Sequence, residues 1–549
     1  MTRCFMIGEK SRVGGGNRAT DNGAGIVVRR TSAYGDAMAA TVVADRLIRE
    51  GFEVDFQCHP DILCAIKHHP TIRSVSAPFG HVHVNLDGAY ENDPDRRKKH
   101  IHQMFFEVAQ KQLEKSGISL GSPLNCRPRI ILPENILSSS RARLSKYSRP
   151  WVFVCPRSDA YNVRQVPDGI WAEAAGKIHG SKFWVGRHPG PSGIADLECR
   201  HFDQIMQYLA VADLLVTVDT GPMHVAAALG IPIVAISQSN SPDLRLSSQC
   251  DFISIAPKLD CLNCQLNVCP INAHLPPCQQ LDPEFIASWA NARLRSITDD
   301  DESAVVAVFQ PTVERLNRCL TQVLPQVREV IVVRDLAGKF PDGALQHPKI
   351  RYILLQQHDT GYGRKQTYGN RHANGKWLLH LNDDCYIGEG AVEKMRSVAT
   401  TDTAMVAHML RYPNGQIQHG GTFRGIGDRG WQHYDIRKWH PTITEVTEME
   451  NVTGACVLVR RKAFFEVGAY DEDFYLMAED NDLCMRLRRS GWRILYTPFA
   501  ESIHEESVST RAHPRYIQIY REACQILESK WGGYWDHNKN RVPLGTFDY

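Results

Sequence analysis

The sequence lacks a long apolar run, a large net charge and a repeat of fixed period. None of its apolar stretches approaches the ~18 residues of a membrane-spanning helix, so we expect no such span. Lysine and arginine (63) nearly balance aspartate and glutamate (61), and a net charge of +2 gives no basic field demanding nucleic acid. Residues 1–17 are too polar and glycine-rich for a signal peptide. We therefore expect a cytoplasmic protein, for which peripheral membrane contact stays open.

Cysteine is not scarce, but it is mostly dispersed. Of the 16 cysteines, all but four are scattered singly, which suits a reducing compartment better than a disulfide framework. The other four, Cys261, Cys264, Cys269 and Cys278, are spaced C-x2-C-x4-C-x8-C. This spacing fits structural zinc or an iron–sulfur cluster, while plain thiols or an occasional disulfide are the alternative.

Length and composition predict a multidomain α/β protein. A chain of 549 residues suggests three or four domains, and 43 % hydrophobic with 23 % charged residues is ordinary for a globular protein. We expect a flexible tail, two Rossmann-like domains, an acidic linker, a second catalytic domain and a helical extension. Their predicted ranges are 1–24, 25–148, 149–295, 296–303, 304–510 and 511–549.

The first half opens with a strand, a helix and a strand, at 25–30, 31–51 and 52–58. This order is typical of a βαβ unit with a parallel sheet. Gly35 and Asp36 lie where the first strand hands over to its helix, the edge at which such sheets bind ligands. Asp36 is therefore a candidate functional carboxylate, with a helix cap as the alternative.

A second run of strands and helices begins at residue 151. A strand at 214–218 leads into Asp219, Thr220 and Gly221, and Gly221–Pro222 opens a helix. The first N–H groups of that helix and its dipole suit a diphosphate. His224, in the first turn, would add a hydrogen bond or a charge; a packing histidine is the alternative.

These two stretches resemble family 9 glycosyltransferases, the heptosyltransferase type. The resemblance rests on TSAYGDAMAATVVADRLIREG and VDTGPMHVAAALGIPIVAI. It implies a GT-B pair of Rossmann-like domains in which Asp36 is the catalytic base. It also implies a nucleotide-sugar site lined by Asp219, Thr220, Gly221 and His224. Arg164 stands near a position where the family often has a basic residue for the donor phosphates.

The second half starts a new α/β pattern at residue 304. A glycine-punctuated helix at 361–375 precedes a strand that ends in Asn382, Asp383 and Asp384. Carboxylates at the carboxyl edge of a sheet suit Mg²⁺ or Mn²⁺ bridging a diphosphate. The alternative is a simple turn.

The most informative stretch is MAEDNDLCMRLRRSGWRILYTPFAESIH, residues 477–504. Glu479, Asp480 and Asp482 open a short amphipathic helix, a strand follows Gly491, and the run ends at His504. Acids at the mouth of a helix and a histidine after the next strand can converge on one pocket. A capped surface helix is the alternative.

Residues 304–508 resemble family 2 glycosyltransferases, in the rhamnosyl- or galactofuranosyltransferase branch. The motifs are PT after the first strand, Asp335 after the second, a DXD-like NDD after the fourth, and VTGACVLVRRKAFFEVGAYDEDF before residues 477–504. The resemblance implies a GT-A domain with Asp480 as general base. Donor contacts would come from Thr312, Asp335 and Asp383, and metal ligands from Asn382, Asp384 and His504.

Together these patterns predict a bifunctional, inverting glycosyltransferase that uses nucleotide-sugar donors. Its acceptor would be a hydroxyl of a glycan, glycolipid or glycoconjugate in a cell-surface polysaccharide, lipopolysaccharide or other glycan. Its second module would need a divalent metal. One alternative makes the first half a binding scaffold, and another makes the acceptor a hydroxylated nucleic-acid base.

Overall fold

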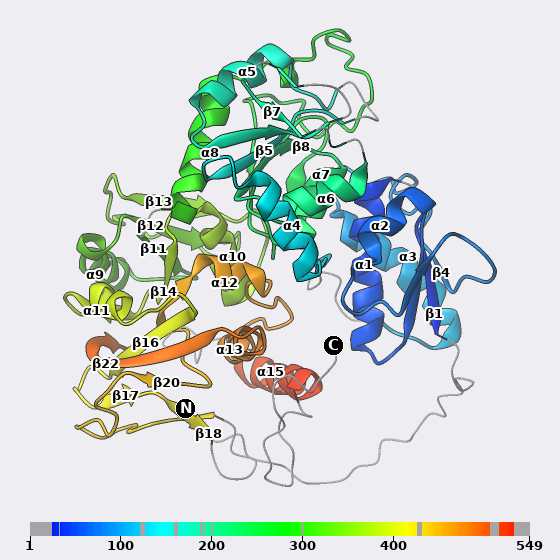
Figure 1. Cartoon of the computed structure of the whole chain (residues 1–549). Helices are drawn as coiled ribbons and strands as arrows, with labels where there is room; N and C mark the ends of the chain where they lie inside the picture. The colour runs from blue at the N-terminus through cyan, green and yellow to red at the C-terminus, as the bar shows by residue number, and fades with distance from the viewer. Residues whose placement is uncertain are drawn as a thin grey trace. The chain divides into compact units, whose positions relative to one another are not determined.

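The computed structural model describes residues 25–31, 33–120, 127–158, 163–186, 190–191, 193–197, 199, 201–298, 301–424, 431–505 and 515–531. They form two compact units, an N-terminal unit up to Ile297 and a C-terminal unit from Thr298 onward (Figure 1). The tail expected at residues 1–24 lies outside the described residues. No helix in the described ranges is long and apolar enough to cross a bilayer.

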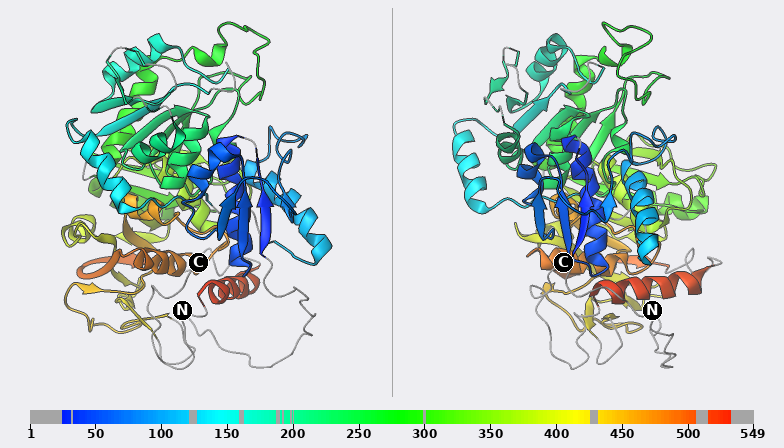
Figure 2. Two further views of the ribbon diagram at one scale, coloured as in Figure 1. Left: turned by 45° about the vertical axis from the view of Figure 1, so that its right-hand side comes forward. Right: turned by 90° about the vertical axis from the view of Figure 1, so that its right-hand side faces the viewer.

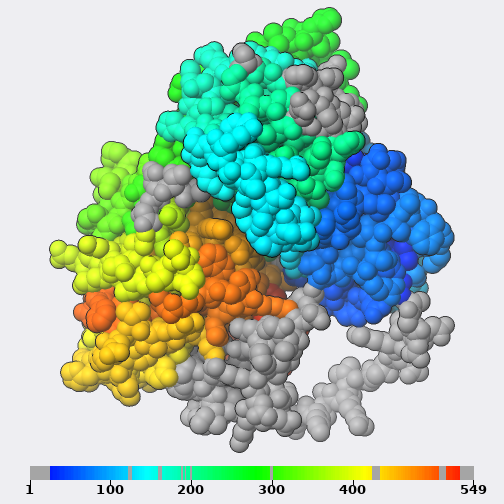
Figure 3. All heavy atoms as spheres, viewed as in Figure 1, coloured from blue at the N-terminus to red at the C-terminus, as the bar shows by residue number. Residues whose placement is uncertain are grey.

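The first sheet of the N-terminal unit is parallel, in the order β3-β2-β1-β4. Its strands are β1 (Ile26–Arg29), β2 (Val54–Gln57), β3 (Ser74–Ser76) and β4 (Val84–Asn85). Helix α1 (Tyr34–Arg49) connects β1 to β2 and buries a run of alanines and valines, which confirms the predicted βαβ opening. Helix α3 (Ile101–Leu113) follows a polar stretch and buries Ile101, Met104, Phe105 and Phe106. Helix α4 (Glu134–Leu144) buries only two of its residues and shows as a cyan ridge in Figure 3.

The second sheet of this unit is also parallel, in the order β10-β9-β8-β5-β6-β7. Its central strands β5 (Trp151–Cys155) and β8 (Leu214–Val218) are buried along their whole length, as in a sheet covered on both faces. The chain proceeds outward from β5 to β6 (Ser181–Trp184) and returns to β8, so the strand order reverses between β5 and β8. In such sheets the crevice at this switch point is where ligands bind. The remaining elements are β7 (Ala195–Asp196), β9 (Ile233–Ile236), β10 (Phe252–Ile255), α5 (Asp168–Lys177), α6 (Phe202–Leu209), α7 (Gly221–Leu229) and α8 (Pro283–Thr298).

The linker predicted at 296–303 is shorter in the structure. Helix α8 continues to Thr298, and the next strand begins at Glu302. Ser296 is buried and its hydroxyl donates to the carbonyl of Arg293 at 2.6 Å. The amphipathic pattern of the helix therefore outweighs the polar composition on which the linker prediction rested.

The C-terminal unit is built on a mixed ten-stranded sheet. Its main path runs β13-β12-β11-β14-β21-β16-β22-β15, parallel from β13 to β14, with β21 antiparallel to both β14 and β16. The long strands β16 (Thr403–Arg411) and β22 (Arg493–His504) lie side by side (Figure 1). The other path strands are β11 (Glu302–Ala307), β12 (Glu329–Arg334), β13 (Ile350–Leu354), β14 (Trp377–Asn382), β15 (Cys385–Ile387) and β21 (Cys456–Arg460). This arrangement confirms the predicted α/β class.

Helices connect the strands of this sheet. The glycine-rich helix α10 (Gly361–His372) and the acidic-fronted helix α13 (Glu479–Arg489) both form where the sequence predicts them. Gly491, with φ 83°, follows the end of α13 as expected of a C-terminal stop. Helix α15 (Tyr516–Trp531) appears in Figure 2 as one continuous helix, and the aromatic tail after it lies outside the described residues. The remaining helices are α9 (Val313–Val323), α11 (Ala391–Ser397) and α12 (Arg461–Glu466).

Candidate active sites

The N-terminal unit contains a cleft of about 1060 Å³. Its floor includes the residues that follow β5 and β8, so it occupies the switch point of the second sheet. Asp36 and Tyr90, which follow strands β1 and β4 of the first sheet, also line the cleft. All predicted site residues of this half face the cleft, and they are Asp36, Arg164, Asp219, Thr220, Gly221 and His224.

Asp36 is held by a cation that the sequence did not single out. Arg30, which has no exposed surface, donates from Nη2 to Asp36 Oδ2 at 2.8 Å and to Glu91 Oε1 at 2.7 Å. Burial disfavours the charge of Arg30, but Glu91 and Asp36 outweigh it and raise its pKa above the usual value. Asp36 keeps 19 % of its side chain exposed. A carboxylate fixed in this way has a set orientation toward the cleft.

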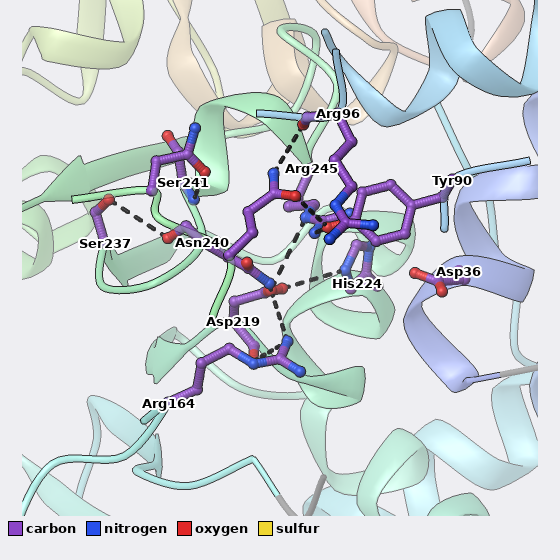
Figure 4. Close-up of polar contacts among 12 residues, drawn as sticks. Asp36, Tyr90, Arg96, Arg164, Asp219, His224, Ser237, Asn240, Ser241 and Arg245 are labelled. Carbon is purple, nitrogen blue, oxygen red and sulfur yellow. Dashed lines mark hydrogen bonds and ion pairs between the residues drawn. The ribbon is translucent and has the colours of Figure 1, made fainter. Parts of the chain in front are cut away.

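Asp219 organises the opposite side of the cleft (Figure 4). Its Oδ2 accepts from Arg164 Nη1 at 2.9 Å and from Asn240 Nδ2 at 2.5 Å. His224 and Arg245 lie 3.6 Å and 4.0 Å from its oxygens. Burial alone would raise the pKa of Asp219, but these neighbours hold it well below the usual range. The Asp219 carboxylate thus makes its contacts within the protein, and it holds the surrounding cations in place.

His224 lies in the first turn of α7, as predicted, and Gly35 makes room for it. A methyl group built on Gly35 would approach His224 Cδ2 to 2.5 Å, closer than real side chains come. The imidazole therefore packs against the start of α1, beside Asp36. Helix α7 starts at Gly221, after the extended Thr220, so its first turn opens into the cleft.

Tyr90, Asn240 and Arg245 are site residues that sequence reasoning missed. Arg245 is 5 % exposed, its guanidinium stacks 4.0 Å from the Tyr90 ring centre, and it donates to the Tyr90 hydroxyl. Each contact joins residues far apart in the chain, and no local motif marks them. Asn240 and Arg245 lie in SNSPDLR, a polar turn after β9, and this composition is a weak indication of a site.

The four clustered cysteines do not form a metal site in this structure. Cys261, Cys264, Cys269 and Cys278 are free thiols, and no three His, Cys, Asp or Glu side chains of the described residues are arranged as a metal-binding group. Burial raises the pKa of Cys278 to about 11, and the three neighbouring thiols add to the effect. The thiols therefore share one neighbourhood, but the zinc prediction is not supported.

In the C-terminal unit, the three predicted metal ligands come together. β15 pairs with the end of β22 so that Cys385 lies opposite His504. His504 Nε2 is 3.2 Å from Asp384 Oδ1 and 3.4 Å from the Asn382 amide. Burial would raise the pKa of Asp384, but His504 and then Arg315 lower it below the usual value.

The orientation of His504 is fixed by Gln418. His504 Nδ1 is 2.7 Å from Gln418 Oε1, and the Gln418 amide nitrogen donates to the His504 carbonyl at 3.3 Å. Because an amide oxygen only accepts, Nδ1 carries a proton, and Nε2 is the ring nitrogen that faces Asp384. A carboxylate and an imidazole nitrogen, with the Asn382 side chain beside them, are groups that Mn²⁺ accepts, so these residues fit the divalent ion that the resemblance implies.

The predicted donor contacts of this unit are engaged with the protein. Asp383 accepts from Arg315 at 3.0 Å, and burial raises its pKa to about 6 despite that cation. Thr312 caps α9 by accepting from the Arg315 backbone N–H at 3.3 Å. Asp335 is fully buried and accepts four hydrogen bonds, from the N–H groups of Ala337, Gly338 and Thr360 and from the Thr360 hydroxyl. Asp335 therefore shapes its own loop, and its contact with a donor stays a prediction.

The three acids at the start of α13 have different partners. Asp482 is fully buried and binds Arg486 at 2.7 Å, Lys530 at 2.6 Å and the indole N–H of Trp531 at 3.0 Å. Burial would raise its pKa, but these cations hold it well below the usual range. Asp482 is thus engaged by side chains of α13 and α15.

Glu479 and Asp480 have different surroundings. Within the described part of the chain Glu479 Oε2 is buried without a hydrogen-bond partner, and burial with the adjacent Asp480 charge raises the pKa of Glu479 to about 8. Asp480 is partly exposed and accepts from the N–H groups of Gly454 (2.9 Å) and Asn481 (2.8 Å). Burial also raises the pKa of Asp480 against the pull of those donors.

Two adjacent residues, Gly454 and Ala455, bind the Asp480 carboxylate and the strand end that leads into the predicted metal-ligand group (Asn382, Asp384 and His504). Gly454 N–H donates to Asp480, and the carbonyl of the next residue, Ala455, accepts from Asn382 N–H at 2.9 Å. The predicted base and the strand end that bears Asn382 are therefore linked through two consecutive residues, directly before the start of β21.

Two family models match the chain. Residues 303–525 match "Glycosyltransferase like family 2", and residues 200–271 match "Glycosyltransferase family 9 (heptosyltransferase)". These matches confirm the two predicted resemblances and identify two glycosyltransferase modules in one chain, a GT-B module followed by a GT-A module.

Several curated proteins are similar to part of this chain. The N-acetylglucosaminyl-diphospho-decaprenol L-rhamnosyltransferase of Mycobacterium tuberculosis is 27% identical over 184 residues, 31% of this chain and 58% of that protein. An O-antigen biosynthesis protein of Myxococcus xanthus is 27% identical over 225 residues, 38% of this chain and 18% of that protein. Among solved structures, a family 9 glycosyltransferase of Veillonella parvula aligns with a TM-score of 0.38 and 16% identity, covering 49% of this chain and 96% of that one. The chain thus spans well under two thirds of the length of both curated relatives.

Proposed function

We propose that this chain, in which a family 9 module is followed by a family 2 module, is a bifunctional inverting glycosyltransferase. Each module would move a sugar from a nucleotide-sugar donor to a hydroxyl group of a glycan, glycolipid or glycoconjugate. The printed names of the relatives, a rhamnosyltransferase and an O-antigen biosynthesis protein, favour the synthesis of a cell-surface glycan.

In the C-terminal module, Asp480 takes the proton of the acceptor hydroxyl. The hydroxyl oxygen forms its bond to the anomeric carbon from one face while the bond to the nucleotide diphosphate breaks on the other, which inverts the configuration. Glu479, with a pKa near 8, holds its proton at neutral pH and leaves the negative charge of the pair on Asp480. Asp384, His504 and Asn382 would hold a Mn²⁺ or Mg²⁺ ion, which would neutralise charge on the leaving diphosphate when bound.

In the N-terminal module, Asp36 has the corresponding role. Arg30 and Glu91 fix its carboxylate, and the cleft opposite it carries the cations that Asp219 arranges. Arg164, His224 and the first turn of α7 would meet the leaving diphosphate without a metal. The described residues that line this cleft include no DXD-like pair of acids.

The observation that carries the proposal is the link through Gly454 and Ala455, which joins a candidate base to a metal-ligand group. The test uses the full chain and its Asp36→Asn and Asp480→Asn variants with a panel of nucleotide sugars that includes an L-rhamnosyl donor. Donor cleavage is measured with and without candidate acceptors. We expect each variant to lose cleavage of one donor and to retain that of another.

An exposed aspartate offers the matched control. Asp342→Asn should leave both activities unchanged, because Asp342 is exposed and is not one of the predicted site residues. If Asp36→Asn changes nothing while Asp480→Asn abolishes all cleavage, the N-terminal module is a binding scaffold. If neither variant loses activity, the proposal is wrong for both modules.

A further inference from the structure

The segment that delivers Asp480 has a strained backbone. Met477 and Ala478, directly before Glu479, have φ angles of 74° and 65°. Residues with a Cβ seldom adopt this left-handed conformation, and they persist in it only where surrounding contacts impose it. Ala478 is also the residue from which α13 starts, so the strained pair sets the direction in which the helix and its first carboxylates point.

Both ends of this segment are tied to a single cation. Lys530, on α15, forms ion pairs with Asp471 and with Asp482, and its distance to Asp482 Oδ1 is 2.6 Å. The two carboxylates are buried, with side-chain exposures of 4 % and 0 %. They lie on either side of the strained pair, at the start and at the end of residues 471–482.

Further contacts from α15 make this attachment specific. Trp531 donates its indole N–H to Asp482 at 3.0 Å and is 3 % exposed. The Lys530 ammonium lies 5.3 Å from the ring centre of Phe474, within the same segment. Figures 1 and 2 show α15 beside α13, and the helix ends at the two residues that make these contacts.

We propose that Lys530 and Trp531 are positioning residues that hold residues 471–482 in the conformation in which Asp480 meets the acceptor. Neither touches the reacting atoms; they act through Asp471 and Asp482. Loss of Lys530 would remove the one cation that both buried carboxylates share, while Asp482 keeps Arg486 and Trp531, so the strained backbone between the two carboxylates would be free to relax. This inference rests on the proposed role of Asp480.

The test compares the full-length chain with Lys530→Met, Trp531→Phe and the conservative Lys530→Arg. Misplacing a reacting group by about 1 Å can lower a rate by about 10²-fold. We therefore expect Lys530→Met to lower kcat of the Asp480-dependent activity by ~10–100-fold, with donor Kd unchanged within about threefold because the metal-ligand residues lie elsewhere. Lys530→Arg should recover a large part of the loss. Trp531→Phe, which removes only the N–H donor, should give a smaller loss of the same kind.

Hydrogen exchange provides a readout independent of activity. Amides of residues 471–482 should exchange at least about tenfold faster in Lys530→Met, while those of the β11–β14 core keep their protection. The matched control is Gln525→Ala, an exposed position on the same helix. If Lys530→Met behaves like Gln525→Ala in both measurements, or if kcat and donor Kd worsen together, the inference is overturned. If faster exchange occurs in a chain whose wild type cleaves no donor, the attachment is real and the proposed function has failed.

Discussion

Glu479, Asp480 and Asp482 lie within one helical turn, yet their surroundings give them different charge states. Asp482 is ionised because three donors reach it, whereas Glu479 is buried and, among the described residues, no donor reaches its Oε2. Asp480 lies between these extremes, with two backbone donors and partial exposure. The environment therefore assigns roles that residue type alone does not distinguish.

Asp480→Asn should remove most transfer by the C-terminal module. Losing a general base costs about 10²–10⁴ in rate, while donor affinity should stay nearly the same because no donor contact is removed. Steady-state kinetics and donor titration on the full chain measure both quantities. An active Asp480→Asn beside an inactive Glu479→Gln would move the role of base to Glu479.

Glu479→Gln should stabilise the C-terminal unit increasingly as pH rises. The pKa of Glu479 is about 8 in the folded chain and near 4.5 when unfolded, so folding binds a proton between these values. The contribution of Glu479 to the free energy of unfolding of the wild type is then largest below pH 4.5. It falls as pH rises from 4.5 to 8, by up to ~1.4 kcal/mol per pH unit.

Thermal unfolding at several pH values between 5 and 8 provides the measurement. The Tm difference between Glu479→Gln and wild type should grow across this range. Glu393→Gln, at an exposed position of α11, should show a constant difference. A constant difference for Glu479→Gln as well would mean that Glu479 is ionised in the folded chain.

At the scale of elements, two helix starts build the N-terminal cleft. Gly35 lies in the first turn of α1 and Gly221 in the first turn of α7, and His224 bridges them by packing on Gly35. Both glycines are needed for space: a methyl group on Gly221 would come within 3.1 Å of Tyr34 and 3.2 Å of Phe202. Close approach of these helices therefore places Asp36 and His224 on facing walls of one cleft.

Gly35→Ala should push His224 away and weaken donor binding by the N-terminal module. Overpacking of this kind typically costs about 1–3 kcal/mol. Gly176→Ala in α5 is the matched control, because a methyl group there meets no atom within 4 Å and should be neutral or slightly stabilising. Calorimetry with the donor that Asp36→Asn fails to cleave, and unfolding of both variants, check this. Equal behaviour of the two variants would contradict the packing described.

The sequence could predict the elements that carry local signals. Periodic apolar strands, the Gly221–Pro222 helix start and the acids of α13 are encoded within a few residues, and they lie where expected. The partners of the site residues could not be predicted in the same way. Arg30–Glu91, Asp219–Asn240 and Asp482–Trp531 join positions 61, 21 and 49 residues apart, and they depend on how the strands are ordered in space. The predicted metal-ligand group could be proposed from the sequence because family motifs mark its members.

For the whole molecule, the two modules should differ in their need for metal. The C-terminal unit has a carboxylate, an imidazole and an amide at its proposed diphosphate site, whereas the N-terminal cleft has guanidinium and imidazole groups. The two proposed activities should therefore be separable by chelation as well as by mutation.

EDTA should abolish the activity that Asp480→Asn removes and spare the one that Asp36→Asn removes. The reason is that leaving-group charge is neutralised by an ion in one module and by fixed protein cations in the other. Adding Mn²⁺ or Mg²⁺ back should restore the first activity, as measured by donor cleavage. Full Asp480-dependent activity in EDTA would rule out the metal assignment.

The short segment at Gly454 and Ala455 has a consequence for motion. Because one residue binds Asp480 and the next binds the strand end that bears Asn382, a displacement of this segment moves both sides of the reaction centre together. The gap between the proton acceptor and the leaving-group side would then stay constant while the sheet around it fluctuates. Directly before β21, one backbone N–H group that donates to the Asp480 carboxylate and one backbone carbonyl that accepts from Asn382 N–H would thus keep this separation constant.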